Sequence, residues 1–378
     1  MPTPSLVLGI LLGVLLASAS DAPLVMENSD HMEGFRGKGE VILTGHVRFR
    51  HGNLRFETER AIWQKDLSRV TCEAGMRLTQ GGARLTADRG SYDKSRNQAL
   101  AQGHVVFRDS GGEMEGDGER LAYDRVRHEA VLSGRPRVRR LYPGDSVSGK
   151  DPDTLTIRAV KLRYNDSANT AEARESVVIT RKNLHITCGR AEYLRKVDSL
   201  YLSEDPNVRA DENEVKGTRM RLGLHGEELR GLWVQGKAEA QSEEKATDST
   251  RARKSRVQGD SLFMAFRAGV VESVQVFHRA LGTYFDVDKP QYVNRMGGDY
   301  MVLRFRDKQV RNAEVLGSAR STYYHFENDS LKGTNLADGD SINFAFRGGK
   351  IDEVLVRGRA RGTYLGRGLE KPAGRGKP

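Results

Sequence analysis

A strand-like segment recurs ten times along this chain, and no other feature of the sequence limits the possible folds as strongly. The clearest copies read VILTGHVRF at residues 41–49 and ALAQGHVVF at residues 99–107. Successive copies are 29 to 42 residues apart. The middle positions of the ten copies are Gly45, Ala74, Gly103, Gly134, Glu175, Glu204, Gly236, His278, Gly317 and Gly358. Such a repeat predicts stacked units, which together bury a face that no single unit could bury alone.

Each copy alternates apolar and polar residues with a period of two. In the first copy Val41, Leu43, Gly45, Val47 and Phe49 share one face, which is typical of a half-buried strand. A second strand follows in the early copies and ends in an aromatic residue, namely Trp63, Tyr92, Tyr123, Tyr164 or Tyr193. No long window has helical periodicity. We therefore expect an all-β fold of about 20 strands in ten repeats, without significant helix.

The composition narrows the class of protein further. Hydrophobic residues make up 37% and charged residues 30% of the 378-residue chain, which excludes a fully disordered protein. The net charge of +10 favours anionic partners. Two cysteines exclude a disulfide-dense scaffold and a zinc site of paired CxxC motifs. Cys72 and Cys188 fall on inward positions roughly 14 Å apart along the stack, so we expect two free thiols.

The two ends of the chain and a polar stretch in its middle indicate how it is organised. The apolar run Leu6–Leu16 precedes Ala17-Ser18-Ala19, a small-residue cleavage site, and is too short to span a bilayer. The expected parts are a signal peptide over residues 1–19, repeats over 35–240, a polar linker or loop over 241–255, further stacked repeats over 256–366, and a basic disordered tail over 367–378.

Three motifs within the repeat point to a known family. Strands of the form x-L-x-G-x-V-x-F occur at Leu43–Phe49 and Ala101–Phe107, and an A-x-x-x-Y-D strand end occurs at Ala87–Asp93. A longer unit, G-D-S followed by G-x-A and T-Y, recurs with variations at residues 259–284, 298–323 and 339–364. Together these motifs resemble the OstA-like domain of lipopolysaccharide-transport periplasmic proteins, a family that includes the N-terminal periplasmic domain of the outer-membrane lipopolysaccharide assembly protein.

This resemblance implies a twisted, V-shaped β-jellyroll of antiparallel strands, open along one side. It implies a non-enzymatic periplasmic protein that holds lipid A acyl chains in an apolar trough and carries or bridges lipopolysaccharide from the inner to the outer membrane. The implied partners are lipopolysaccharide and other OstA-like jellyroll proteins, namely an inner-membrane-anchored component and an outer-membrane barrel, joined by edge-strand addition. Neither nucleic acid nor a cofactor is expected.

The inward positions of the early repeats supply the candidate lipid-binding residues, because acyl chains in water need an apolar lining. These residues are Val47, Phe49, Phe56, Met76, Leu78, Leu85, Val105, Phe107, Val177 and Ile179. Headgroup phosphates suit guanidinium groups, and Arg135, Arg137 and Arg139 form the candidate headgroup contacts. A second basic cluster over residues 251–256 suits anionic headgroups or a solvated face.

Two strings resemble catalytic or metal-binding motifs, but each has a simpler explanation. Gly259-Asp260-Ser261-Leu262 spells an esterase nucleophile block, yet the equivalent copy at residues 298–300 has no serine, so we expect a repeated turn and no catalytic residue. His46 and His104 recur at one outward position, about 10 Å apart if strands are evenly spaced, which is too far for one metal ion. We expect them to be solvated.

Some repeats have a charged residue or a histidine instead of glycine at the middle position, and these residues are also candidates for catalysis or metal binding. Glu175 and Glu204 could form an acid/base pair or a cation site, but a widened turn that lets both side chains reach solvent is the preferred interpretation. His278 occupies the same position and is expected to be an interior histidine rather than a metal ligand.

Two alternatives to the lipid carrier remain open at this point. One is a structural or scaffolding β-repeat protein of the cell envelope that has a closed, dry interior and binds partners through exposed edge strands. The other is a secreted β-helical enzyme that cleaves polysaccharides, which would need clustered carboxylates and exposed aromatic residues in a surface groove.

Overall fold

The computed structural model describes residues 22–35, 39–144, 151–226, 228–246, 251–327, 329–348 and 350–366. The chain divides into two compact units, with unit 1 ending at Glu204 and unit 2 beginning at Asp205. The expected signal peptide and the expected basic tail lie outside the described residues.

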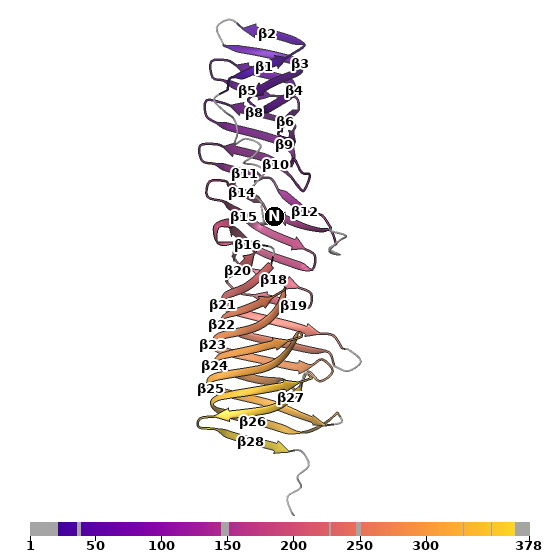
Figure 1. The fold of residues 1–378 in the computed structure, drawn as a ribbon, viewed down its shortest axis with the longest axis vertical. Helices are drawn as coiled ribbons and strands as arrows, with labels where there is room; N and C mark the ends of the chain where they lie inside the picture. The colour runs from indigo at the N-terminus through magenta and orange to yellow at the C-terminus, as the bar shows by residue number, and fades with distance from the viewer. Residues whose placement is uncertain are drawn as a thin grey trace, which may run out of the picture. The chain divides into compact units, whose positions relative to one another are not determined.

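Within each unit, antiparallel strands follow one another in chain order (Figure 1). Unit 1 contains β1 Leu24–Asn28, β2 His31–Phe35, β3 Glu40–His51, β4 Leu54–Gln64, β5 Arg69–Cys72, β6 Met76–Gln80, β7 Ala83–Ala87, β8 Arg89–Asp93, β9 Gln98–Arg108, β10 Met114–Asp124, β11 Glu129–Ser133, β12 Arg137–Tyr142, β13 Asp153–Arg158, β14 Lys161–Asn165, β15 Thr170–Arg181, β16 Leu184–Leu194 and β17 Ser199–Ser203, with one 3-10 turn at Arg195–Val197. Unit 2 contains β18 Asn207–Ala210, β19 Asn213–Lys216, β20 Arg219–His225, β21 Glu228–Glu244, β22 Arg253–Arg267, β23 Val270–Asp286, β24 Asn294–Arg306, β25 Gln309–Glu327, β26 Ser330–Arg347, β27 Lys350–Arg357 and β28 Arg361–Gly366.

The expected all-β fold is confirmed, and no α-helix occurs in the part of the chain that the structure describes. The described residues form 28 strands rather than about 20. The difference arises because the repeat position breaks several expected strands in two. One strand is interrupted between Cys72 and Met76, and another is interrupted between Ser133 and Arg137.

The long strands of unit 1 each contribute their two halves to two separate layers. The second half of β4 pairs with β5, as in Ala61 opposite Cys72, whereas its first half pairs with β6, as in Phe56 opposite Leu78. Layer A contains β5, β8, β11, β14 and β17, and layer B contains β6, β7, β12 and β13, each with the adjoining halves of the long strands. Unit 2 repeats this division, with β20 and β27 in its layer A and β19 and β28 in its layer B.

The chain passes from one layer to the other at a corner made by two consecutive residues with positive φ. In β3 these residues are Gly45 (φ 72°) and His46 (φ 45°), and the cross-strand register shifts by one residue there. The same pair recurs at Gly103–His104, Gly134–Arg135, Glu175–Ser176, Glu204–Asp205, Gly236–Lys237, His278–Arg279, Gly317–Ser318 and Gly358–Arg359, whereas in the second repeat only Gly75 has positive φ. A positive φ is energetically unfavourable for any residue that has a β-carbon. This explains why glycine is frequent at the first position of the pair.

The corner corrects one expectation and supports two others. His278 is exposed rather than interior, because the middle position of the repeat bends away from the core instead of pointing into it. Glu175 and Glu204 are exposed at their turns, as preferred above. His46 and His104 are also exposed, and their Nδ1 atoms lie 2.7 Å and 2.8 Å from carboxylate oxygens of Asp30 and Asp88, respectively.

The two ends of the segment 241–255, which was expected to be a polar linker or loop, belong to strands. Residues 241–244 belong to β21 and residues 253–255 belong to β22, with Ser242 opposite Ser255. Its charges are paired across the two strands, since the Lys254 ammonium lies 3.2 Å from the Glu243 carboxylate. The charged residues at 241–244 and 253–255 therefore lie on two paired strands, and the division between the compact units falls earlier, after Glu204.

The Gly-Asp motif of unit 2 is a packing device at the corner. A β-carbon at Gly259 would lie 2.5 Å from Cγ1 of Val276, and one at Gly298 would lie 2.7 Å from Cγ1 of Val315. Only glycine leaves room for these valines. The aspartate that follows accepts hydrogen bonds at the corner, as Asp340 does from Arg359 at 2.6 Å. The repeated string is thus explained by packing.

Replacing Gly259 with alanine should lower the free energy of unfolding by about 1–3 kcal/mol, because the added methyl group overlaps Val276. Gly362→Ala is the matched control, since no atom lies within 4 Å of the added methyl group there. Ser261→Ala should change stability by less than about 0.5 kcal/mol. Urea unfolding followed by circular dichroism measures all three, and equal losses for Gly259→Ala and Gly362→Ala would contradict the packing explanation.

The pKa values of His46 and His104 should lie above the ordinary value of 6.5, because hydrogen bonding and charge attraction from Asp30 and Asp88 favour the imidazolium. A raised pKa in the folded state means that the pairs stabilise the fold fully below pH 6.5 and lose this contribution as the pH rises through the folded pKa. Imidazole titrations by NMR measure both values. Asp30→Asn should lower the pKa of His46 alone; an unchanged value would refute the pairing.

Candidate functional site

The interior of unit 1 lies between layers A and B, which contact each other through aromatic side chains. The rings of Phe49 in layer B and Trp63 in layer A meet edge to face with centroids 5.5 Å apart. The Phe56 and Tyr92 rings make a second contact between the layers at 4.9 Å. Such pairs add to the free energy of apolar burial. The apolar faces of the two layers are thus turned toward each other.

All ten predicted lining residues lie on the inner face of layer B. Each is buried, with 0–4% of its surface exposed. They come from β3, β4, β6, β7, β9 and β15, so the structure brings them together as one wall.

The opposite wall belongs to layer A and was missed as a set of candidate residues. Its buried members include Leu43, Ala61, Val70, Cys72, Ala101, Leu121, Leu132, Leu162, Ala173, Ala191 and Leu202. The alternation in the first half of each repeat, as at Val41 and Leu43, could have identified them, because a strand that changes layers contributes to both walls.

A ladder of aromatic residues closes the side of unit 1 that lies opposite the corner. Tyr92 and Tyr123 both lie opposite Ala99, and Tyr123 and Tyr164 both lie opposite Ala130. The complete ladder in layer A contains Trp63, Tyr92, Tyr123, Tyr164 and Tyr193. Tyr123 and Tyr164 have alanine on both neighbouring strands, which leaves room for their rings, and the aromatic positions noted in the sequence form one continuous seam.

The tyrosine hydroxyls of this seam are held as neutral groups. Burial raises the pKa of Tyr92 to about 12 and that of Tyr123 to about 12. The Tyr92 hydroxyl lies 2.8 Å from Nδ1 of His51, which is itself buried in layer B. This hydroxyl contact joins the two layers at the seam, in addition to the contact between the Phe56 and Tyr92 rings.

The three arginines predicted to contact headgroups are not on the interior side. Arg135 forms a corner, and Arg137 and Arg139 project from the face of β12 opposite to the buried Val138. Arg137 lies 2.9 Å from Asp117, and Arg139 also pairs with a carboxylate on β10. The alternation of β12 decides this placement, since odd and even residues of a strand point to opposite faces.

Two other arginines lie at the seam, on the inner side of layer B. The guanidinium groups of Arg140 and Arg181 lie 5.0 Å and 4.2 Å from the centre of the Tyr142 ring. The Arg181 side chain also donates a hydrogen bond of 2.6 Å to Asp153, which is buried. Arg140 and Tyr142 lie two and four residues after Val138, so they share its face of the strand. This spacing could have identified the cluster from the sequence.

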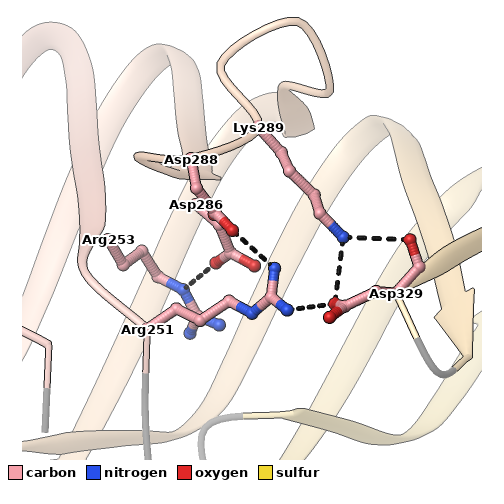
Figure 2. Close-up of polar contacts among 6 residues, drawn as sticks. All are labelled: Arg251, Arg253, Asp286, Asp288, Lys289 and Asp329. Carbon is pink, nitrogen blue, oxygen red and sulfur yellow. Dashed lines mark hydrogen bonds and ion pairs between the residues drawn. The ribbon is translucent and has the colours of Figure 1, made fainter.

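The second basic cluster, residues 251–256, is neutralised by carboxylates. Figure 2 shows Arg251 between Asp288 and Asp329, with Lys289 also on Asp329. Arg253 lies 3.4 Å from Asp286. These pairs connect the start of β22 to the end of β23, to the loop after it and to the turn between β25 and β26. The cluster therefore links neighbouring turns and is not an open cationic surface.

A cleft of about 420 Å³ lies near the corner of unit 1. Val47 and Met76, which are part of the interior wall, contribute to its lining, and Arg48, Glu57 and Arg77 line its outer part. The cleft occurs next to Ala74 and Gly75, where the chain leaves strand conformation between β5 and β6. Interior residues therefore approach the surface at this point.

Both cysteines are free and buried, as expected. Burial raises the pKa of each thiol to about 12, so both are protonated and unreactive at neutral pH. Within the described ranges, no group of three or more His, Cys, Asp or Glu side chains is arranged to hold a metal ion. The described residues also include no helix that is long and apolar enough to cross a membrane.

The fold and interior define an antiparallel β-jellyroll repeat with an apolar core between two layers. Residues 28–151, a third of the chain, match the family described as LptA/(LptD N-terminal domain) LPS transport protein. The resemblance to the OstA-like lipopolysaccharide-transport family is thereby confirmed on this stretch.

Comparison with solved structures gives matches that include LptH, the LptA-homologous periplasmic component of the lipopolysaccharide transport device of Pseudomonas aeruginosa. That match has 11% sequence identity, covers 50% of this chain and 86% of LptH, and has a TM-score of 0.18, which carries no argument about the fold. No curated protein sequence matches the chain.

Neither Cys72 nor Cys188 should react with a thiol reagent such as dithionitrobenzoate while the protein is folded at mildly alkaline pH, because burial keeps both thiols protonated and inaccessible. Both should react once guanidinium chloride unfolds the chain. Absorbance of the released thiolate measures this. Two rapidly reacting thiols in the native protein would contradict the described interior.

Proposed function

We propose that this protein takes part in lipopolysaccharide transport as a non-enzymatic carrier or bridge in the periplasm, and that unit 1 holds the acyl chains of lipid A between its two layers. The continuous apolar interior of unit 1 carries this proposal, together with the family match over residues 28–151. Each methylene group buried there gains about 0.8 kcal/mol, so several chains would be held firmly.

Acyl chains enter this interior when the layers separate along the aromatic seam. The lining residues are buried in the structure. When an acyl chain enters, contacts between the two layers are therefore replaced by contacts with the lipid. The seam is suited to such opening, because ring contacts such as that between Phe56 and Tyr92 can be replaced by ring contacts with methylene groups. Arg140 and Arg181 at the seam can then meet a headgroup phosphate, for which guanidinium is well matched.

The last strands of unit 2 support a partner of the same fold. Both β27 and β28 pair with β26, and the inner-face residues Val354 and Tyr364 are 42% and 51% exposed. A strand that presents unpaired backbone groups and an apolar inner face accepts another strand. We propose that a jellyroll of the OstA-like type docks there and continues the interior.

The closed interior also favours a second candidate function. If the layers never separate, the repeat is a structural envelope protein that joins partners only through its edge strands. This alternative is favoured by the 0–4% exposure of the lining residues and predicts a protein that binds no lipid.

Mass spectrometry of lipids extracted after gentle purification from the native envelope separates the two functions. The carrier predicts lipid A species at near-stoichiometric yield. An empty protein that also fails to take up added lipopolysaccharide would leave only the structural role.

Val105 and Val106 provide a matched pair for testing the interior directly, because the first is fully buried and the second is 48% exposed on the outer face. Val105→Asp should abolish loading with lipopolysaccharide, since it places a carboxylate among the acyl chains. Val106→Asp should leave loading unchanged. Loading is measured by mass spectrometry on variants that retain the wild-type circular dichroism spectrum, with Val177→Asp as a second interior position. Equal loading of all three would place the lipid elsewhere.

A further inference from the structure

The outer face of layer A in unit 2 carries a row of aromatic and aliphatic side chains across five consecutive strands. The row contains Trp233 on β21, Phe263 on β22, Phe277 on β23, Tyr300 on β24 and Leu316 on β25. Trp233 lies opposite Phe263, Phe277 lies opposite Tyr300, and Tyr300 lies opposite Leu316. Phe263 lies opposite Gln275, so the part on β21 and β22 is offset by two residues from the part on β23 to β25. We call these five residues the aromatic row. Trp233 is 38% exposed although its neighbours Leu232 and Val234 are buried, so the row faces solvent.

The rings of the row are tilted toward one another and lie close to the sheet. The Trp233 and Phe263 centroids are 4.7 Å apart with an interplanar angle of 33°, and those of Phe277 and Tyr300 are 5.1 Å apart at 45°. The indole of Trp233 rests on glycine, because a methyl group added at Gly231 would lie 2.7 Å from the ring. The rings therefore form a platform rather than protruding side chains.

The groups beside the middle of the platform are polar and uncharged, and charged groups lie toward its two ends, namely Arg221 at one end and the ion pair of Arg304 with Glu314 at the other. The Tyr300 hydroxyl donates a hydrogen bond of 2.9 Å to the Gln275 side chain, and the side-chain amides of Asn312 and Asn343 meet at 2.7 Å. Arg221 lies 4.9 Å from the centre of the Trp233 ring. Amides and hydroxyls that donate and accept hydrogen bonds next to flat rings suit a ligand that has both hydroxyl groups and apolar faces.

The repeat itself does not require this surface. The equivalent outer face in unit 1 is laddered with ion pairs, such as Arg69 with Asp93 at 2.6 Å and Arg190 with Glu172 at 2.7 Å. Cross-strand aromatic pairs do stabilise sheets, but the equivalent outer face of unit 1 is built with ion pairs, so two aromatic pairs on one exposed face are not needed for the repeat to fold. An exposed patch of this kind marks an interaction site.

We propose that the aromatic row of unit 2 binds an extended β-1,4-linked N-acetylhexosamine glycan, the polymer type of cell-wall strands. Such a glycan is a flat ribbon whose equatorial substituents leave apolar faces that stack on rings, and its amides and hydroxyls match Gln275 and Asn312. The two ring pairs, Trp233 with Phe263 and Phe277 with Tyr300, are offset along the strands, so each pair stacks on its own stretch of an extended glycan. The uncharged centre of the platform fits a glycan better than an anionic membrane, and the proposal is independent of lipid carriage.

Tryptophan fluorescence offers a direct test, because Trp63 and Trp233 are the two tryptophans of the chain. In a Trp63→Phe variant, emission comes from Trp233 alone, and a hexamer of β-1,4-linked N-acetylglucosamine should change it saturably. By calorimetry on the full chain, Trp233→Ala should weaken binding of the hexamer about tenfold, the size expected for the loss of one stacked ring. Trp233→Phe should retain most of the affinity.

Tyr201→Ala is the matched control, since Tyr201 is an exposed aromatic residue on the outer face of layer A in unit 1. It should leave affinity for the hexamer unchanged. Absence of any fluorescence change and heat, or equal losses for Tyr201→Ala and Trp233→Ala, would overturn the proposal. So would binding of anionic phosphatidylglycerol vesicles through Trp233 without binding of the hexamer, or full displacement of the hexamer by the core oligosaccharide of lipopolysaccharide.

Discussion

The pair of residues with positive φ in the middle of every repeat except the second is the constraint on which the structure depends. At Gly45 and His46 the strand gains one residue against its partner and leaves one layer for the other. Repetition of this corner divides each unit into two layers, and the apolar residues on either side of it then face each other. Without the corner, the same alternating strands would form one flat sheet with an exposed apolar face, which is unstable in water. The corner therefore creates the interior.

The repeat and the all-β class could be predicted from the sequence because period-two alternation and recurring glycines reflect local physics. The buried wall of layer B was predictable for the same reason, as Val105 and Phe107 illustrate. The corner was not, because a middle glycine on the apolar face looks like a small core residue, and this is why His278 was expected inside. The prediction of which arginines face the interior was wrong at β12, because neighbouring residues of a strand point to opposite faces. Arg139 pairs with a carboxylate on the outer face, whereas Arg140 lies at the seam.

The two units use one corner geometry with different side chains around it. In unit 1 the residues just past the corner are bulky, as at Val47 and Phe49, whereas in unit 2 they are small, as at Ala280 and Ala319, and valines of the next strand occupy the space beside Gly259 and its equivalents. A bulky inner wall that closes through an aromatic seam is suited to exchange with lipid. Unit 2 has small residues at the same positions, and its outer face carries the aromatic row.

The most direct test of the central claim is site-specific photocrosslinking at two adjacent positions on β9. A photoreactive phenylalanine analogue at Phe107 is on the buried inner face, and the same analogue at Val106 is on the outer face. In cells that are exporting lipopolysaccharide, illumination should join lipopolysaccharide to the protein from position 107 and not from position 106. Crosslinks from position 106 alone, or from neither position in a folded and correctly exported protein, would contradict an interior that opens to acyl chains.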